Sequence, residues 1–193
     1  MKSLIEKRMP LYEGRRITRE EYLDLPDDGY KYDMIQGVLH MSPSPFFEHC
    51  YAVSQFIYLL TGYLKKKPVG FAVSEIDILL PDGGDILRPD ISFLFKEHKD
   101  IIIGHIHGVP DLICEVLSQK TATRDFGEKA ERYLKNGVKE YYILDPRDKS
   151  MQIWLNRKTK WEKIICQKGD MLKSQILQGF HISAEEIFSE IDE

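Results

Sequence analysis

Apolar and polar residues repeat along this chain with two different periods, and the changes of period divide the chain into helices and strands. Residues 18–21 have the Thr-x-x-Glu spacing of a capping box and predict the start of a short helix that ends at Pro26. Residues 30–41 alternate around a Gln-Gly pair, which predicts a hairpin. Residues 46–67 contain no proline and are dominated by apolar side chains. They predict the longest helix, buried on most of its circumference.

The middle of the chain is predicted to form strands. Residues 69–80 indicate a strand or a pair of strands, and residues 90–95 indicate another, which a proline introduces. Residues 112–118, LICEVLS, are apolar at alternate positions of both sets, odd and even, except at Glu115. Such a run is typical of a central strand that is covered on both faces.

The second half of the chain continues the same mixture. Residues 123–136 form an amphipathic pattern that an Asn-Gly pair closes, which predicts a helix. Residues 140–144 indicate a strand, residues 151–156 and 161–167 a hairpin, and residues 183–191 a short final helix. Strands surround two principal helices, so the predicted fold class is α/β or α+β with a mixed β-sheet flanked by helices.

Composition and charge narrow the function classes. The 193 residues, 42% hydrophobic and 30% charged, suit one globular domain with an ordinary core. The formal net charge of -4 means that non-specific binding to nucleic acid would need a local basic patch or bound metal ions. The 3 cysteines, with no close pair, argue against a disulfide framework and a zinc ribbon. No signal peptide or membrane span is evident, so a cytoplasmic protein without a membrane partner is expected.

Glu115 and Asp90 are the first candidates for chemistry. A carboxylate inside an apolar central strand costs several kcal/mol unless a proton, a cationic side chain or a metal compensates it. Asp90 follows Pro89 at the start of the preceding predicted strand. Two acids on neighbouring strands can share one cation, and their hard oxygen ligands suit Mg²⁺ or Mn²⁺. The alternative is that both acids cap strands or pair with lysines.

A lysine on the following helix is the third candidate. Asp125, Lys129 and Tyr133 are spaced i, i+4 and i+8, so they share one helix face. The helix follows the Glu115 strand after a short loop, so it can pack back beside that strand and carry the Lys129 ammonium towards the metal. There the ammonium could orient the attacking water or stabilise charge on a phosphate. The alternative is a surface ion pair between Asp125 and Lys129, worth about 0.3–0.5 kcal/mol.

These residues resemble the Uma family of restriction-endonuclease-like proteins. The resemblance rests on the order and spacing of short motifs along most of the chain: Pro89-Asp90, Glu115-Val116-Leu117-Ser118, Asp125, Lys129, Tyr133, Gly137-Val138-Lys139-Glu140-Tyr141, and upstream Asp33, Gly37, Met41-Ser42-Pro43 and His49. It covers residues 18–155, which leaves residues 1–17 as an N-terminal extension and residues 156–193 as a C-terminal hairpin and short helix of a single domain.

The resemblance implies a restriction-endonuclease-like core of the PD-(D/E)xK nuclease superfamily and Mg²⁺-dependent hydrolysis of phosphodiesters, with DNA as the expected substrate. It implies a metal set of Asp90, Glu115 and Val116, with Lys129 as the catalytic lysine. The superfamily places this lysine two residues after the glutamate, where this chain has Leu117. The lysine moved to the helix maps onto Lys129.

The resemblance also implies accessory positions and leaves alternatives. Asp33 stands where the family usually has a longer glutamate, and His49, Asp125 and Tyr133 are the other possible accessory residues near the site. A catalytically silent module that binds nucleic acid or a protein is the alternative to a nuclease, and a hydrolase for a smaller phosphate substrate is a third reading. A homodimer would suit the cutting of two strands. Six basic residues could form either a phosphate-facing rim or a solvated face: Lys65, Lys66, Lys67, Arg124, Arg132 and Lys135.

Overall fold

A six-stranded mixed sheet forms the centre of the molecule in the computed structural model, which describes residues 10–82, 84–166 and 169–189. The strands stand in the order β12-β11-β10-β9-β6-β3. Their bounds are β3 Gly70–Ser74, β6 Ile91–Phe95, β9 Leu112–Val116, β10 Glu140–Asp145, β11 Ser150–Asn156 and β12 Trp161–Cys166. Only β9 and β10 pair in parallel, and every other neighbouring pair is antiparallel. The mixed sheet predicted from the sequence is therefore confirmed.

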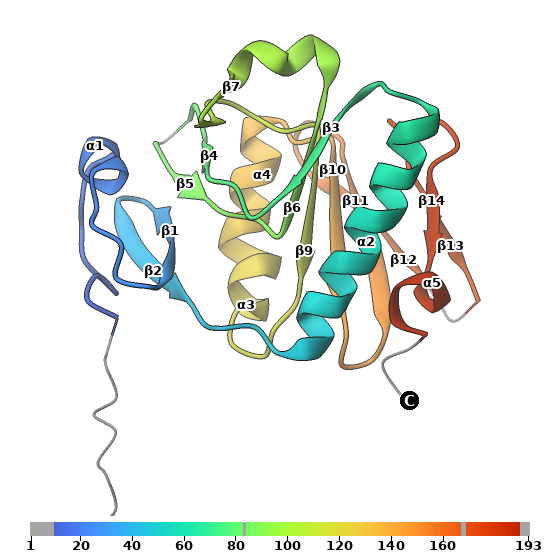
Figure 1. Ribbon diagram of the computed structural model, residues 1–193, viewed down its shortest axis with the longest axis horizontal. Coiled ribbons are helices and arrows are strands. Elements are labelled where there is room, and N and C mark those ends of the chain that lie inside the picture. The colour runs from blue at the N-terminus through green and yellow to red at the C-terminus, as the bar shows by residue number, and fades with distance from the viewer. Residues whose placement is uncertain (1–9, 83, 167–168, 190–193) are drawn as a thin grey trace, which may run out of the picture.

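Helices cover both faces of this sheet (Figure 1). On one face lies α2, Phe47–Lys66, the longest helix, as predicted. The expectation that it is buried on most of its circumference is wrong: it buries one stripe against the strands, and its other side faces solvent, because this helix covers an outer face of the sheet. The buried stripe is Ala52, Phe56, Leu60 and Leu64. On the other face lies the predicted amphipathic helix, which has three parts. They are α3 Ala122–Arg124, a π-helical turn η2 Asp125–Lys129, and α4 Ala130–Asn136.

The central strand β9 supplies side chains to both layers. Cys114 and Val116 pack in the core on the α2 side, and Ile113 and Leu117 pack in the core on the α4 side. Successive side chains of a strand point to opposite faces. Glu115 therefore projects toward the α4 side, where its polar partners have to come from the helix that covers that face.

A second sheet lies beside the α4 layer and contains the N-terminal hairpin (Figure 1). Its strands stand in the order β2-β1-β5-β4-β8-β7. Their bounds are β1 Lys31–Ile35, β2 Val38–Ser42, β4 Ile78–Leu79, β5 Ile86–Leu87, β7 Ile102–Ile103 and β8 His105–Ile106. The hairpin predicted at residues 30–41 is confirmed as β1 and β2. A capping box at Thr18 and Glu21 opens the short helix α1, Arg19–Leu23, as predicted.

The C-terminal segment adds a further hairpin and helix to the α2 face. Strands β13 Met171–Lys173 and β14 His181–Ser183 pair with each other, and α5 Ala184–Phe188 follows them. Leu172, Phe180 and Ile187 from this segment are buried in the same core as α2. The expected hairpin of residues 151–156 and 161–167 is present as β11 and β12, with residue 167 outside the described residues. Residues 190–191 of the expected final helix also lie outside them.

The elements that the sequence pattern did not predict are short. Strands β5, β7, β8, β13 and β14 have two or three residues each, and η1, Lys96–Ile101, is a 3-10 helix. Two or three residues are too few to show alternation, so hydrophobic periodicity cannot detect them. Of the expected N-terminal extension, residues 1–9 lie outside the described part, while Gly14 donates a backbone hydrogen bond to Leu39 in β2. In the described ranges no helix combines the length and the apolar composition needed to cross a bilayer.

Glu140, at the amino end of β10, is a buried carboxylate that ties the C-terminal segment to the sheet. It accepts hydrogen bonds from the backbone N–H groups of Gln175, at 2.5 Å, and Ile176, at 3.1 Å, and from the Ser174 hydroxyl at 2.8 Å. Burial raises the pKa of Glu140, against the lowering effect of these hydrogen bonds. Its place at the amino end of β10 gives Glu140 a structural role.

Glu140→Ala is expected to lower the free energy of unfolding by about 2–6 kcal/mol, because two backbone N–H groups lose their acceptor and each loss costs about 1–3 kcal/mol. Exposed Glu162→Ala is the matched control. The raised pKa also sets a pH dependence: the stability of the wild type relative to Glu140→Gln is greatest below the ordinary value of 4.5 and falls as pH rises through the folded-state pKa. Urea unfolding of these proteins across pH measures both effects, and equal losses in Glu140→Ala and Glu162→Ala would contradict the structural role.

Candidate active site

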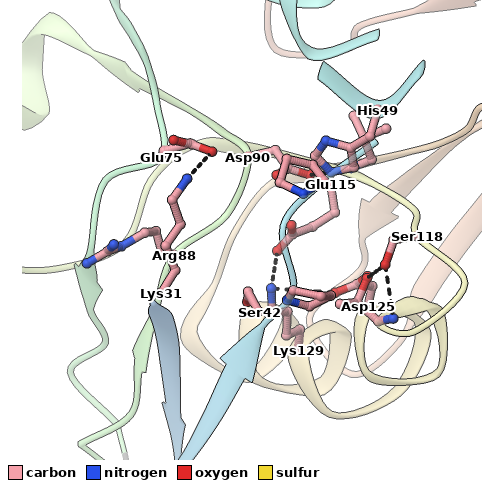
Figure 2. A pocket seen from close by; sticks show the side chains of 14 residues that line it. Lys31, Ser42, His49, Glu75, Arg88, Asp90, Glu115, Ser118, Asp125 and Lys129 are labelled. Carbon is pink, nitrogen blue, oxygen red and sulfur yellow. Dashed lines mark hydrogen bonds and ion pairs between the residues drawn. The ribbon is translucent and has the colours of Figure 1, made fainter. Parts of the chain in front are cut away.

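A buried lysine surrounded by carboxylates lies where the α4 layer meets β9 and the N-terminal hairpin. The Lys129 Nζ atom is 3.0 Å from Glu115 Oε1, 3.2 Å from Asp33 Oδ2 and 3.5 Å from Asp125 Oδ1. None of these four side chains is more than 5% exposed. The Tyr133 hydroxyl adds a hydrogen bond of 2.9 Å to the same Glu115 oxygen. Figure 2 shows Glu115 directed down from its strand onto Lys129.

The π-helical turn η2 supplies two members of this cluster. Asp125 and Lys129 are its first and last residues, and both are buried. A π-turn inserts one extra residue into a helix and widens it locally, and such turns occur frequently at functional sites. The turn lies directly opposite Glu115, and Tyr133 follows one turn later in α4. Of the residues that the helical spacing placed on one face, Lys129 and Tyr133 contact Glu115 and Asp125 contacts Lys129, although the backbone between them is not a regular α-helix.

Asp90 occupies the other side of Glu115. It immediately precedes β6, and the register that pairs Ile91 with Cys114 places Asp90 opposite Glu115. The Asp90 Oδ2 atom accepts a hydrogen bond of 2.7 Å from the backbone N–H of Val116 and lies 3.3 Å from His49 Nε2. Asp90 is thus fixed against the end of β9 by the strand backbone and by the first turn of α2.

One pocket, open to solvent, connects these groups. It contains the carboxylates of Asp90, Glu115 and Asp125 together with Lys129 and His49. The other residues that line it are Lys31, Ser42, Pro43, Pro45, Glu75, Arg88, Val116, Ser118 and Thr121. Figure 2 shows these side chains arriving from both sheets, from α2 and from the α3–η2 turn. The pocket is therefore a meeting point of segments that are far apart in the sequence.

The electrostatics of the cluster are dominated by excess negative charge. Burial raises the pKa of Glu115 well above its ordinary value, and the carboxylates of Asp125, Asp90 and Asp33 raise it further while Lys129 opposes them. Burial also raises the pKa of Asp125, again against Lys129. Glu115, Asp33 and Asp125 thus lie within 3.5 Å of one buried ammonium, with Asp90 on the other side of Glu115, and this excess of acids favours the arrival of another cation.

The pKa values of Lys129 and His49 are also raised, and for these two bases a raised pKa favours the charged form. Burial by itself lowers the pKa of Lys129, but Asp33, Glu115 and Asp125 outweigh it and hold that pKa well above its ordinary value. Burial likewise opposes the charged form of His49, and the contact with Asp90 reverses this and raises the pKa of His49. The Lys129 side chain is therefore an ammonium that can donate hydrogen bonds and carry charge near neutral pH.

The donor set fits a hard divalent cation that is held mainly by water and substrate. The Asp33 Oδ2 and Asp125 Oδ1 atoms are buried and have no hydrogen bond, although both lie near the Lys129 ammonium. Within the described ranges, no three His, Cys, Asp or Glu side chains already converge as ligands. Mg²⁺ commonly binds one or two carboxylates and keeps several waters. Asp90 and Glu115, which line one pocket, are sufficient for that type of site.

The structure brings together all of the side chains that the sequence singled out for this site. Asp33, His49, Asp90, Glu115, Asp125, Lys129 and Tyr133 either line the pocket or contact a residue that does. The alternative of a surface ion pair between Asp125 and Lys129 is wrong, because both side chains are buried.

The predicted basic rim does not form as one surface. Arg124 lies near the site, with its Nη1 atom 3.8 Å from Asp33 Oδ2. Arg132 pairs with Asp85 and Lys135 with Asp82, while residues 65–67 lie at the far end of α2. The sequence also missed Arg88, whose backbone N–H donates a 2.9 Å hydrogen bond to Asp33 and whose side chain lines the pocket. No local pattern around residue 88 signals this contact, because it depends on pairing between β1 and β5.

Comparisons with known proteins agree with this architecture. The family model Uma2, described as "Putative restriction endonuclease", matches residues 19–185. The crystal structure of "a putative nuclease belonging to DUF820" from Anabaena variabilis ATCC 29413 is similar with a TM-score of 0.78 and 19% sequence identity. The similarity covers 90% of this chain and 98% of that chain. No curated protein matches the sequence. The solved structure supports the fold, and the family model covers most of the chain.

Proposed function

The chain belongs to the Uma2 family of putative restriction endonucleases, and from this premise we propose that it is a divalent-metal-dependent nuclease that hydrolyses phosphodiester bonds in DNA. The observation that carries the proposal is the pocket in which Asp90 and Glu115 stand beside a buried Lys129 ammonium. A binding module gains nothing from three carboxylates and a lysine removed from solvent, because burying such groups costs free energy. An enzyme can offset the free-energy cost of burying these groups if they stabilise the transition state more than the bound substrate.

Asp90 and Glu115 are the proposed metal ligands, with the backbone of Val116 beside them. A bound Mg²⁺ or Mn²⁺ would lower the pKa of a water ligand and neutralise charge on the phosphate. Asp90 is fixed for this role by the Val116 N–H and by His49. Tyr133 holds the Glu115 carboxylate from behind. These neighbours position the ligands, as partners around a metal site usually do.

Lys129 is proposed to act as a charged donor toward the reacting phosphate or the attacking water. Its ammonium is held by Asp33, Glu115 and Asp125, so its charge is in place before substrate arrives. A preorganised charge of this type stabilises negative charge that develops in the transition state without further reorganisation. Asp33 and Asp125 are therefore proposed as positioning residues for Lys129.

A cleavage assay tests this function against the alternatives. The protein is incubated with plasmid DNA, single-stranded DNA and RNA, in Mg²⁺ or Mn²⁺ and, in parallel, in chelator. We expect cleavage of DNA that requires the metal, because the uncompensated carboxylates repel a phosphodiester in its absence. Gel electrophoresis of the products measures the result. The same nucleic acids bound without cleavage at any metal concentration would instead indicate a silent binding module.

A further inference from the structure

A second hollow adjoins the candidate active site and has a different character. It is open to solvent and lies between the β2–α2 linker and the ends of β9 and β10. Its apolar surface comes from Pro43, Pro45, Phe46, Leu117 and Pro146. The carboxyl ends of parallel strands are where open α/β sheets commonly bind ligands. β9 and β10 are the parallel pair of this sheet.

The hollow is continuous with the pocket that contains Asp90 and Glu115. Pro43, Pro45, His49 and Ser118 line both spaces. His49 is thus a shared wall: its Nε2 atom faces Asp90 on one side, and the residue belongs to the apolar hollow on the other. A substrate whose reacting group occupies the first pocket would therefore place its neighbouring group in the second.

Aromatic side chains stand exposed at the rim of this hollow. Phe46, which lines it, is 78% exposed, and the adjacent Phe47 is 71% exposed. Phe47 stacks on Tyr51 one helical turn later, with ring centroids 6.0 Å apart. The buried residues of α2 are Ala52, Phe56, Leu60 and Leu64, so these two phenylalanines are outside its core-facing stripe. The structure thus presents the flat apolar ring of Phe46 to solvent next to the candidate site.

The charges around the hollow do not select an anion. Lys120 and Glu48 line it with opposite charges, and the Arg147 guanidinium is held by Asp145 at 2.5 and 2.8 Å. Gln119 and Ser44 add neutral polar groups. The occupant that fits has a flat apolar face and polar edges. It is covalently linked to the group that occupies the pocket with Asp90 and Glu115. A nucleobase has this chemistry, because its face stacks on aromatic rings and its edge forms hydrogen bonds.

We propose that this hollow receives one unpaired nucleobase next to the scissile phosphate, with Phe46 as the stacking platform. The proposal rests on the proposed nuclease function and adds its substrate class. Bases in a duplex are stacked inside and do not reach such a space unless they are extruded. The favoured substrate is therefore a single strand or a locally opened end.

The experiment compares the full-length wild type with Phe46→Ala and Phe46→Trp, using a fluorescently labelled oligothymidylate and its duplex with oligoadenylate. Tyr58→Ala is the matched control, because Tyr58 is an aromatic of α2 that is 71% exposed and lines neither pocket. Binding is measured by fluorescence anisotropy with Ca²⁺ in place of Mg²⁺ or Mn²⁺, because a hard cation that takes oxygen ligands compensates the carboxylates. Gel electrophoresis of the same samples checks that no strand is cut. Single-stranded DNA is expected to bind the wild type more tightly than the duplex does. Phe46→Ala should raise the Kd for the single strand about 5–150-fold, which corresponds to loss of one base–aromatic stack.

Phe46→Trp should restore the affinity, and the fluorescence of the new indole should be quenched when the single strand binds. Equal affinities in Phe46→Ala and Tyr58→Ala would overturn the proposal. So would self-association that Phe46→Ala abolishes without any change in oligonucleotide binding, because a second copy would then cover the hollow. A protein that binds through Phe46 but cuts nothing would leave the base site standing and refute the nuclease function. A protein that cuts DNA, but whose affinity for the single strand is unchanged by Phe46→Ala, would refute the base site and leave the nuclease function standing.

Discussion

Glu115→Gln is expected to abolish metal-dependent cleavage and to remove the stabilisation that metal gives. The amide keeps the size of the side chain and can still accept the hydrogen bond from Tyr133, but it loses the charge that holds a hard cation. Loss of a metal that supplies the nucleophile and neutralises the phosphate removes several kcal/mol of transition-state stabilisation. The rate should fall by at least about 10²-fold, comparable to removal of one preorganised donor.

Thermal unfolding gives a second, independent measurement for the same variant. Metal at about 100 times its Kd stabilises the wild type by about 2.7 kcal/mol. In a protein of this size each kcal/mol raises the Tm by about 2–4 °C. Glu115→Gln should show no such rise. Its metal-free form should be at least as stable as the wild type, because burial raises the pKa of Glu115 and the neutral amide avoids that cost.

The control for this pair of measurements is Glu131→Gln, which removes a charge from an exposed position of α4. It should retain both the cleavage rate and the response of Tm to metal. A Glu115→Gln protein that responds to Mg²⁺ or Mn²⁺ as the wild type does would show that the ion binds elsewhere. In that case the proposed roles of Asp90 and Glu115 would both be lost.

Lys129→Met is expected to reduce kcat by about 10²-fold or more, because the preorganised ammonium acts where negative charge builds on the phosphate. The structure adds a cost in stability that a surface pair would not carry. Breaking a buried ion pair by removing one partner typically costs about 3–5 kcal/mol. Here the loss would leave Glu115, Asp33 and Asp125 without their common cation. Added metal should recover part of this stability, since it would compensate the same carboxylates.

Activity must therefore be compared at a temperature at which circular dichroism shows both proteins folded. Lys129→Gln is the second variant, because its amide can still donate hydrogen bonds to the carboxylates while lacking the charge. Lys135→Met is the matched control: this lysine is on the same helix, and its side chain is 65% exposed and pairs with Asp82. A folded Lys129 variant that cuts at the wild-type rate would exclude Lys129 from the mechanism. Loss of kcat in both Lys129 variants, with Lys135→Met unaffected, would support the role.

Strong periodicity made the long elements predictable. The 20 residues of α2 and the five of β9 have apolar patterns that one packing environment explains: one buried stripe for the helix and two buried faces for the strand. The capping box at Thr18 is local in sequence, and it was predicted for the same reason. The small strands of the second sheet were not, because a two-residue strand such as β5 exists only through its partners in β1 and β4.

The residues of the site also divide into those that a local pattern identified and those that it did not. Glu115 was identifiable because a carboxylate in an apolar strand needs a partner wherever the strand lies. The helical spacing of Asp125, Lys129 and Tyr133 identified the face that would meet it. Asp33 and His49 were placed by family resemblance, and no pattern of their own pointed to Lys129 or Asp90.

Patterns within the sequence predicted a mixed sheet and its two principal helices, and they identified most of the residues that surround Glu115. The packing of separate segments was needed to bury Lys129 among three carboxylates, to bring the Arg88 backbone N–H onto Asp33, and to leave Phe46 exposed beside the site. The physical reason is the range of the interactions. Periodicity, capping and the cost of a buried charge act within one element, whereas ion pairing among β1, β9 and η2 depends on distances that the packing of separate segments sets.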